Sequence, residues 1–534
     1  MSRLATGASL AAVVMLALAP AVLYRGERQV PAQRIVVVVS PHNEQIRQEF
    51  STGFARWHRE HFGEAAEVRW NTPGGTTEIR RMLIAQTESA LRSGSPVGGQ
   101  ADILFGGGSY EFDLLTKPVT VDGDPPRSAT VLAPCEWITP QMLEEWYGAN
   151  DIAGKKIYDP KLHWFGVAFS TFGIVSNIVR CEELGVHPPQ RWEDLAQPAL
   201  RGSVILANPA QSGSVATAFE TILQRLGWTR GWQVLRRAAA NSNHIIASSS
   251  VVPTKVGNGE SAAGVAIDFY GRFQVQSLAD AAERTGLDSI ARLQFVAPAK
   301  ESVIDPDPIA VLRGAPHPEM AQRFVEYCLS TDGQMLWQAA PGSESDEACD
   351  HPRPVRYALR RLPSRRAVYS CCIDCFVDRI NPFDEPSIPA PNPNYRDFVS
   401  TLFLPMAMSH TPLLQAAWQR IIAHPSYPAG SAVVSAADVS DAQLKRWLEA
   451  FDAMPTAPAA DGVELKLASL DDIGAVRAGW LKGGFKDRSL WESRDDPRTL
   501  LRRRFAAFFE RQYRSIIEDV DPSVLQHRDG TEGK

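Results

Sequence analysis

The 534-residue sequence predicts an α/β protein in which strands and helices alternate. Three observations predict this class. Residues 35–39 form an unbroken β-branched run, which is typical of a strand buried on both faces. Residues 44–59 place Phe50, Phe54 and Trp57 at helical spacing. The order of strand, turn and helix then repeats along the chain, which is the pattern of a doubly wound sheet.

The first unit continues through two more strands. A short strand is predicted at 67–70, and a helix starts after the Gly-Gly-Thr-Thr turn at 74–77. A third strand at 102–105 leads into the glycine-rich loop 106–110. Hydroxyls and bare glycine N–H groups therefore follow successive strand ends. Open α/β sheets bind ligands at this edge, so a small polar or anionic ligand is expected there.

The alternation restarts near residue 164 in a second unit. Residues 167–175 predict two strand pieces interrupted at Ser170-Thr171, and 264–270 predict a strand that ends in acidic and phenolic side chains. Strand character returns at 293–297, and 318–337 has the spacing of a helix.

The motif Asn-Pro-Ala-Gln-Ser-Gly-Ser at 208–214 lies between a predicted strand, 204–207, and a predicted helix. Ser212, Gly213 and Ser214 would then stand at the helix N-terminus, where backbone N–H groups have no intrahelical partner. These donors, two hydroxyls and the helix dipole favour an anion. A serine that only caps the helix is the alternative.

Composition excludes some classes of partner. The formal net charge is −6 and no basic stripe is visible, so nucleic acid is not expected. No Gly-x-x-x-x-Gly-Lys-Ser/Thr motif and no helix-opening Gly-x-Gly-x-x-Gly is present, so a nucleotide site is not favoured.

The first 24 residues differ from the rest. Arg3 precedes an apolar run over about 8–23, which predicts a cleaved secretory signal or an N-terminal anchor. Either alternative places the body of the protein outside the cytoplasm, in the periplasm or its equivalent.

Four cysteines gather in the C-terminal half: Cys349, Cys371, Cys372 and Cys375. In an oxidising compartment a disulfide within this group is expected. A zinc site is the alternative, and it would need Cys349 or His351 to complete its ligands.

The sequence changes character beyond Pro341. A basic segment (353–366), proline-rich stretches and several helices predict a mainly helical extension over 341–534. The last long helix places Leu501, Phe505, Phe508, Phe509, Ile516 and Ile517 on one side. This side is expected to pack on the body, with a membrane-surface role as the alternative.

Taken together, the motifs of residues 34–340 resemble the extracytoplasmic solute-binding proteins of ABC importers. The group they resemble most is the ferric-ion-type group of the two-lobed type II family. The resemblance rests on the order and spacing of these stretches: Ser40-Pro41-His42-Asn43, Gly74-Gly75-Thr76-Thr77, the strand and loop 102–108, Trp192-Glu193-Asp194-Leu195, the motif 208–214 and Ala266-Ile267-Asp268-Phe269-Tyr270-Gly271.

The resemblance implies a two-lobed α/β fold. Lobe 1 would be 34–165 with a return at 290–340, and lobe 2 would be 166–289, with hinges near Ser170 and Gln294. It implies a monomer with no required cofactor and no enzymatic activity. Its ligand would bridge the lobes, favour closure and be delivered to a membrane permease.

The resemblance also implies the site. The matching binding positions are Ser40, His42, Thr76, Thr77, Gly107, Gly108, Ser109, Ser170, Ser212, Gly213, Ser214, Asp268 and Tyr270, with Tyr270 as a candidate metal ligand. Ferric-binding relatives present adjacent tyrosines, whereas Gly271 follows Tyr270 here. Ferric ion, a chelated metal and a phosphate- or phosphonate-bearing solute therefore all remain candidates.

Two other classes are kept as alternatives. One is an extracytoplasmic hydrolase that uses Ser212 and His42, although Ala210 breaks the Gly-x-Ser-x-Gly pattern. The other is a ligand-sensing or scaffold protein that uses the same fold and a partner surface within 341–534.

Overall fold

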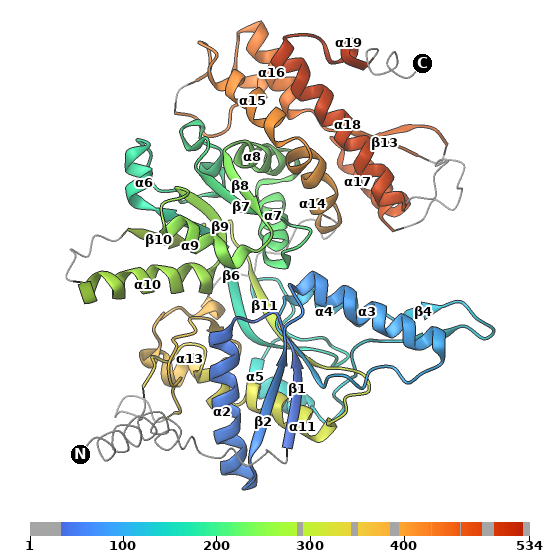
Figure 1. Ribbon diagram of the computed structural model, residues 1–534, viewed down its shortest axis with the longest axis vertical. Coiled ribbons are helices and arrows are strands. Elements are labelled where there is room, and N and C mark those ends of the chain that lie inside the picture. Colours follow the sequence, from blue (N-terminus) through green and yellow to red (C-terminus); the bar gives the residue numbers. More distant parts are fainter. Residues whose placement is uncertain are drawn as a thin grey trace, which may run out of the picture.

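In the computed structural model the chain folds into two α/β lobes stacked along its longest axis (Figure 1). The structure describes residues 34–285, 292–342, 351–384, 395–428, 430–459, 461–482 and 496–526. The predicted signal or anchor segment and Cys349 lie outside these residues.

Lobe 1 begins with a parallel sheet in which β1 pairs with β2 on one side and β3 on the other. Val36 and Val38 of β1 are fully buried, as the β-branched run predicts. Asn43 caps the following helix by accepting from Ile46 N at 3.2 Å. The elements are β1 (Arg34–Val39), α2 (Glu44–Phe62), β2 (Ala66–Asn71), α3 (Thr76–Ser93), β3 (Ile103–Phe105), α4 (Ser109–Leu115), β4 (Val119–Val121), β5 (Arg127–Ala129) and α5 (Pro140–Tyr147).

One long strand, β6 (Phe165–Asn177), joins the lobes. Its first half pairs antiparallel with β11 (Ile304–Val311), and its second half pairs with β9 and β10. The change of partner falls around Thr171, which faces Ile304, and Phe172, which faces Ile267. The predicted interruption at Ser170-Thr171 is therefore wrong, because ladder pairs on both sides of it keep the strand continuous.

Lobe 2 continues the same sheet, whose main path is β2-β1-β3-β11-β6-β9-β7-β8. Its elements are α6 (Ile178–Glu183), η1 (Trp192–Ala196), η2 (Pro198–Leu200), β7 (Val204–Ala207), α7 (Gly213–Leu226), α8 (Trp228–Ala240), β8 (Ser242–Ile246), η3 (Ser249–Val251), α9 (Val252–Gly257), β9 (Ala263–Ile267), α10 (Asp268–Thr285) and β10 (Leu293–Val296). The predicted strand 264–270 is thus too long, since Asp268 already starts a helix.

After β11 the chain lies on lobe 1. The predicted helix 318–337 is two helices, α11 (Pro318–Leu329) and α12 (Thr331–Met335), because Ser330 leaves the helical conformation and caps α12. The short strand β12 (Leu362–Pro363) then adds to β6, with Leu362 opposite Phe169. The helices α13 (Ala367–Cys372), η4 (Ile373–Cys375) and η5 (Pro382–Asp384) follow.

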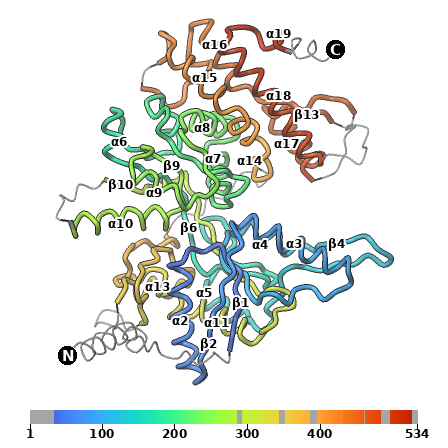
Figure 2. The backbone as a smooth tube through the Cα atoms, viewed as in Figure 1, coloured from blue at the N-terminus to red at the C-terminus, as the bar shows by residue number. Residues whose placement is uncertain are grey.

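From residue 395 the chain covers lobe 2, as the orange and red tube beside the green one shows (Figure 2). Its elements are α14 (Arg396–Phe403), η6 (Leu404–Met408), α15 (Thr411–Ile422), η7 (Ala436–Asp438), α16 (Ala442–Asp452), β13 (Thr456–Pro458), β14 (Glu464–Lys466), α17 (Leu470–Val476), η8 (Arg477–Leu481), α18 (Pro497–Glu518) and α19 (Pro522–Gln526).

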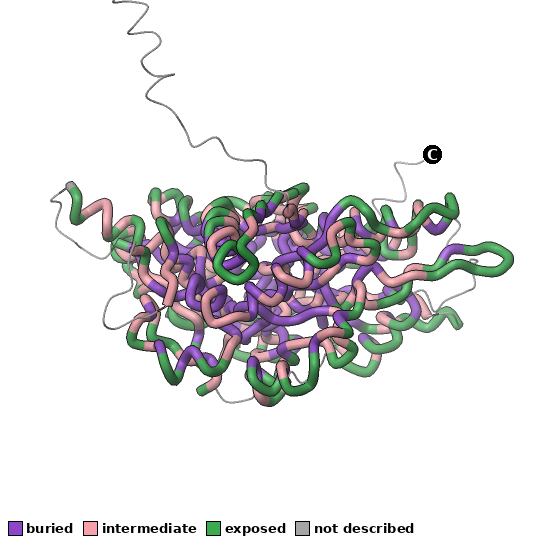
Figure 3. The backbone as a smooth tube through the Cα atoms, turned by 90° about the horizontal axis from the view of Figure 1, so that it is seen from below, coloured by how far each residue is buried: buried purple, intermediate pink, exposed green. Residues whose placement is uncertain are grey.

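Lobe 2 and this covering layer share one hydrophobic core. The rings of Phe219 and Phe403 lie 4.8 Å apart, and those of Trp228 and Tyr395 lie 4.9 Å apart. The buried segments lie in the interior and the exposed ones mostly at the periphery (Figure 3). Leu501, Phe505, Phe509 and Ile516 of α18 are buried in this core, so the apolar side of the last long helix packs on the body as predicted.

Candidate functional site in the interlobe cleft

A cavity of about 430 Å³ lies between the lobes. Lobe 1 contributes the ends of β1, β2 and β3, and lobe 2 contributes the ends of β7, β8 and β9. Strands β6 and β11 form the wall where the lobes meet. The lining residues are Pro41, His42, Gly74, Gly75, Thr76, Glu78, Gly107, Gly108, Ser170, Phe172, Gln211, Ser212, Gly213, Ser214, Thr217, Ala247, Ser248, Ser249, Ser250, Ile267, Phe269, Tyr270, Asp305, Pro306, Asp307 and Arg361.

The N-terminus of α7 carries a cluster of three hydroxyls. Ser212 caps the helix by accepting from Val215 N at 3.4 Å. Its Oγ lies 3.1 Å from Ser214 Oγ and 2.9 Å from Ser249 Oγ, and Ser214 and Ser249 are also 2.9 Å apart. Each hydroxyl can rotate to donate or accept, so the cluster can turn its hydrogens toward an anion at the positive end of the helix.

The N-terminus of α3 faces α7 from the other lobe. Gly75 caps α3, and its N–H donates to the Glu78 carboxylate at 3.1 Å. A Cβ added to Gly75 would lie 3.1 Å from the backbone oxygen of Gln211, which precedes α7. The two helix N-termini therefore meet across the cleft, and the Glu78 carboxylate also lines the cavity at the α3 end.

A buried charged group forms the opposite wall. Arg361 donates to Asp307 Oδ2 at 2.5 Å and to Ser170 Oγ at 2.6 Å. His42 Nε2 lies 2.8 Å from the same carboxylate oxygen and 3.1 Å from the guanidinium. Gly107 N–H donates to Asp307 Oδ1 at 2.7 Å. One network therefore joins Ser170 of β6, Asp307 of β11 and Arg361, which directly precedes β12, with residues of two loops.

Burial and the neighbouring charges set the protonation of this group. Burial lowers the pKa of His42; Asp307 opposes this effect and Arg361 adds to it. Burial alone would raise the pKa of Asp307, but Arg361 and His42 outweigh it and hold the pKa well below its usual range. Asp307 and Arg361 are therefore both charged, and their charges cancel. Among the described residues, His42 Nδ1 has no hydrogen-bond partner.

Tyr270 lies in the first turn of α10 and lines the cavity. Burial raises the pKa of its phenol to about 12. The adjacent Phe269 lies beneath Arg361, whose Cζ is 4.4 Å from the ring centroid. This cation–π contact stabilises the position of the Arg361 guanidinium beside the cavity.

Nine of the thirteen candidate ligand-binding residues line the cavity: His42, Thr76, Gly107, Gly108, Ser170, Ser212, Gly213, Ser214 and Tyr270. The other four are buried beside it and bond within the protein. Ser40 Oγ accepts from His42 N, Thr77 donates to Glu111, Ser109 donates to Asp305, and Asp268 accepts from Thr171 and from its own helix at Phe269 N.

Several lining residues escaped the sequence analysis, Arg361 and Asp307 above all. Arg361 lies within the basic segment, where nothing local distinguishes it from its neighbours. Asp307 lies in the unusual run Asp-Pro-Asp-Pro of β11, and Ser249 lies in the Ser-Ser-Ser run that follows β8. Both runs are unusual enough in the sequence to mark Asp307 and Ser249 as candidate site residues.

Comparison with known proteins shows similarity over part of the chain. Residues 140–354 match the family described as bacterial extracellular solute-binding protein. The phosphoglycerate transport regulatory protein PgtC of Salmonella typhimurium is 29% identical over 193 residues, which cover 36% of this chain. The matched part spans only 45% of that relative's length.

Solved structures are less similar to this chain in sequence. AfuA from Actinobacillus pleuropneumoniae aligns with 57% of this chain and 82% of its own, at 18% identity and a TM-score of 0.43. Iron-bound HitA from Pseudomonas aeruginosa aligns with 70% of this chain and 98% of its own, at 16% identity and a TM-score of 0.46. No ligand is inferred for this chain from these two structures.

The observed architecture confirms the predicted two-lobed α/β fold with a mainly helical C-terminal part. The match of residues 140–354 to the extracellular solute-binding family agrees with the predicted resemblance. A family of extracellular proteins agrees with a location outside the cytoplasm. In the described part of the chain, no helix is both long enough and apolar enough to cross a membrane.

Proposed function

We propose that this protein is the solute-binding component of an ABC importer and that its cleft captures a small anion bearing a phosphate or phosphonate group. The observation that carries this proposal is the cluster of Ser212, Ser214 and Ser249 at the N-terminus of α7. Hydroxyls and unpaired helix N–H groups are the donors that tetrahedral oxyanions prefer.

The rest of the cavity supports the same ligand class. The N-termini of α3 and α7 both face it, while Arg361 is the only cation among its lining residues. Asp307 already neutralises Arg361, so main-chain and hydroxyl donors supply most of the attraction. The name of the Salmonella relative, which includes phosphoglycerate transport, also favours a phosphorylated solute.

A bare ferric ion fits this cavity less well. Tyr270 is the only tyrosine among its lining residues, and its raised pKa opposes the phenolate form that binds iron. The Asp307 carboxylate is engaged by Arg361, His42 and Gly107. A ferric chelate with an anionic carrier such as citrate lies outside the proposed phosphate or phosphonate class, and the test below includes it for comparison.

The proposed mechanism is lobe closure without turnover. An anion between α3 and α7 gains donors from both lobes only when they approach, so binding shifts the protein toward the closed form. A membrane permease would then recognise that form. A hydrolase is less well supported, because the Ser212 hydroxyl bonds to two serines and to Val215 N and not to His42. The ring of His42 instead contacts Asp307 and Arg361.

A thermal-shift series tests the ligand class. Phosphate, 3-phosphoglycerate, phosphonates and ferric citrate are added to the purified protein, alongside ferric salt alone. At 100 times its dissociation constant, a ligand stabilises the fold by about 2.7 kcal/mol. We expect a phosphorylated anion to raise Tm, and we expect Ser212→Ala/Ser249→Ala to abolish the rise. Ser128→Ala, an exposed serine of lobe 1, is the matched control.

Two results would contradict the proposal. A rise with ferric salt alone that disappears in Tyr270→Phe but survives in the serine variant would assign the cleft to a metal ion. Steady hydrolysis of a phosphoester that stops in Ser212→Ala would assign it to an enzyme.

A further inference from the structure

A second group of ligand-type side chains does not line the cleft and lies at the end of α13 and in the loop that carries His351. His351, Cys371 and Cys372 offer one nitrogen and two sulfur atoms that all lie within 4.8 Å of one another. The two cysteines end α13 and form a disulfide between adjacent residues. The disulfide expected within the cysteine group is therefore present.

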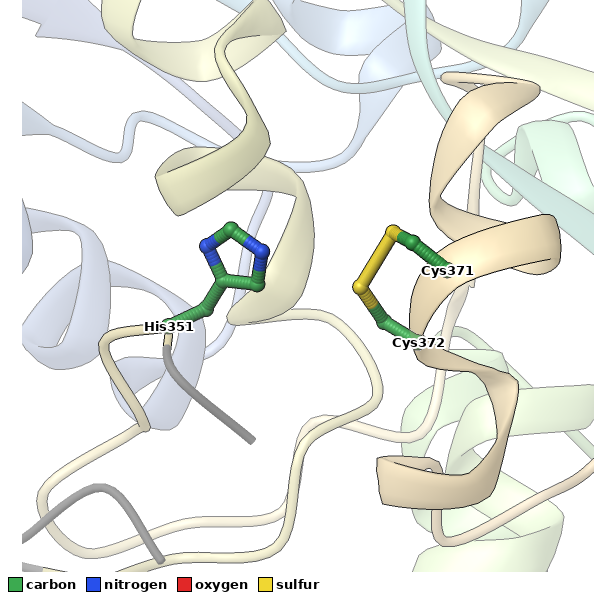
Figure 4. A group of neighbouring side chains, drawn as sticks. All are labelled: His351, Cys371 and Cys372. Atoms are coloured by element: carbon green, nitrogen blue, oxygen red, sulfur yellow. A yellow bond between two sulfur atoms is a disulfide. The ribbon is translucent and has the colours of Figure 1, made fainter. Parts of the chain in front are cut away.

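The histidine is oriented toward the sulfurs. It comes from a separate loop, and one of its ring nitrogens faces the cysteine pair (Figure 4). The other side of the ring is near a carboxylate, because His351 Nδ1 lies 3.8 Å from Asp332 Oδ1. This separation is too long for a hydrogen bond, so Asp332 places negative charge near the ring without fixing its orientation.

We propose that the reduced protein binds a thiophilic divalent cation, such as Zn²⁺, through His351, Cys371 and Cys372. Thiolates and imidazole are the ligands that Zn²⁺ prefers, at about 2.3 Å and 2.0 Å respectively. Cys372 is buried and Cys371 is exposed, so the cation would be half enclosed and would keep an open position for water.

Redox state controls this site. A dithiol reductant transfers two electrons and two protons to the Cys371–Cys372 bond, which breaks into two thiols while the reductant becomes a disulfide. The cation then displaces both thiol protons as it binds. While the Cys371–Cys372 bond is intact neither sulfur is a thiolate, so of these three residues only His351 can bind the metal, and one imidazole does not retain it.

The experiment compares oxidised and reduced full-length protein. The protein is reduced with a dithiol, freed of reductant without oxygen, and incubated with Zn²⁺. Bound zinc is then measured with a chromophoric chelator. We expect one zinc ion per reduced chain and none per oxidised chain. Co²⁺ in place of Zn²⁺ is expected to give thiolate-to-cobalt charge-transfer absorption, which reports sulfur ligation directly.

Variants assign the ligands. Cys371→Ser/Cys372→Ser and His351→Ala are each expected to weaken zinc binding at least tenfold. Cys375→Ser, outside the three-residue cluster, and the exposed-histidine variant His187→Ala are expected to bind as the unmodified protein does. The oxidised unmodified protein is a second negative control that needs no substitution.

Three results would overturn the proposal. The first is reduced protein that binds no more zinc than oxidised protein. The second is a Co²⁺ complex without charge-transfer absorption. The third is an equal loss of binding in Cys375→Ser and in the Cys371/Cys372 variant.

Discussion

Gly213 and Thr76 face each other across the cleft so closely that a Cβ on Gly213 would collide with Thr76 Oγ1. Gly213 is the first residue of α7 in lobe 2, and Thr76 is the first residue of α3 in lobe 1. The absence of a side chain at residue 213 thus allows the two helix N-termini to meet.

The first prediction concerns this contact. Gly213→Ala is expected to hold the lobes apart or displace Thr76, and to weaken anion binding about tenfold, or about 1.4 kcal/mol. Isothermal titration with the anion identified by thermal shift measures the change. Thr76→Ala in the same chain removes the colliding atom and should restore part of the affinity. If the double variant binds more weakly than both single variants, lobe contact is not the cause.

The second prediction concerns Arg396, a residue of the C-terminal part that contacts both lobes. It donates to Gly213 O at 3.2 Å and to Thr217 Oγ1 at 3.0 Å in lobe 2. Its guanidinium also lies 4.0 Å from Glu111 Oε1 and 4.6 Å from the centre of the Tyr110 ring in lobe 1. Arg396 therefore links the two lobes beside the N-terminus of α7.

Arg396→Gln should shift the protein toward an open form. We expect a larger radius of gyration in small-angle scattering and roughly tenfold weaker anion binding. The substitution removes both contacts of Arg396 with lobe 1, the ion pair with Glu111 and the cation–π contact with Tyr110, and a cation–π contact contributes about 0.5–2 kcal/mol. Lys482→Gln is the control, because Lys482 contacts Asp397 within the layer that covers lobe 2. Equal effects of the two variants would contradict this role of Arg396.

The third prediction concerns the joint between lobe 2 and its covering layer. Arg237 of α8 is fully buried and donates to both carboxylate oxygens of Asp452 at 2.6 and 3.0 Å. Asp452→Asn leaves this guanidinium without its counter-ion, which is expected to lower the free energy of unfolding by about 3–5 kcal/mol. Thermal and urea denaturation measure the loss.

A surface pair gives the matched control. Glu510 and Arg514 lie one turn apart on α18 and are largely exposed, so Glu510→Gln should cost less than about 1 kcal/mol. Similar losses in the two variants would show that burial does not set the strength of the Arg237–Asp452 pair.

The fourth prediction concerns pH. Burial lowers the pKa of His42 in the folded protein, whereas in the unfolded chain it is about 6.5. The unfolded chain therefore binds a proton that the folded protein does not. The stability contributed by neutral His42 is complete above about pH 6.5 and is lost as the pH falls toward the folded pKa, by at most about 1.4 kcal/mol per pH unit.

His42→Gln removes this titration. The decrease in Tm between pH 7 and pH 5 should be smaller in His42→Gln than in the unmodified protein. His187→Gln, which changes an exposed histidine, should leave the decrease as it is. The same pH dependence in all three proteins would mean that His42 does not control it.

Local sequence determined much of the fold and part of the site. The strand at 204–207 and the serine cap of α7 lie where the sequence predicts them. A cap and a β-branched run depend on residues only a few positions apart, so the sequence alone shows them. The continuity of β6 and the early start of α10 at Asp268 were missed, because ladder pairing with distant strands decided both.

The tertiary structure alone decided the charged wall of the cleft. Ser170, Asp307 and Arg361 meet because β11 pairs with β6, with a register shift directly after Asp307, and β12 adds to the same strand. Ser170 and Asp307 are 137 residues apart in the sequence, and Asp307 and Arg361 are 54 apart, so no local pattern predicts these contacts. The sequence thus identified the hydrogen-bond donors at the N-terminus of α7. The pairing of distant strands determined that Asp307 and Arg361 lie on the opposite side of the cavity.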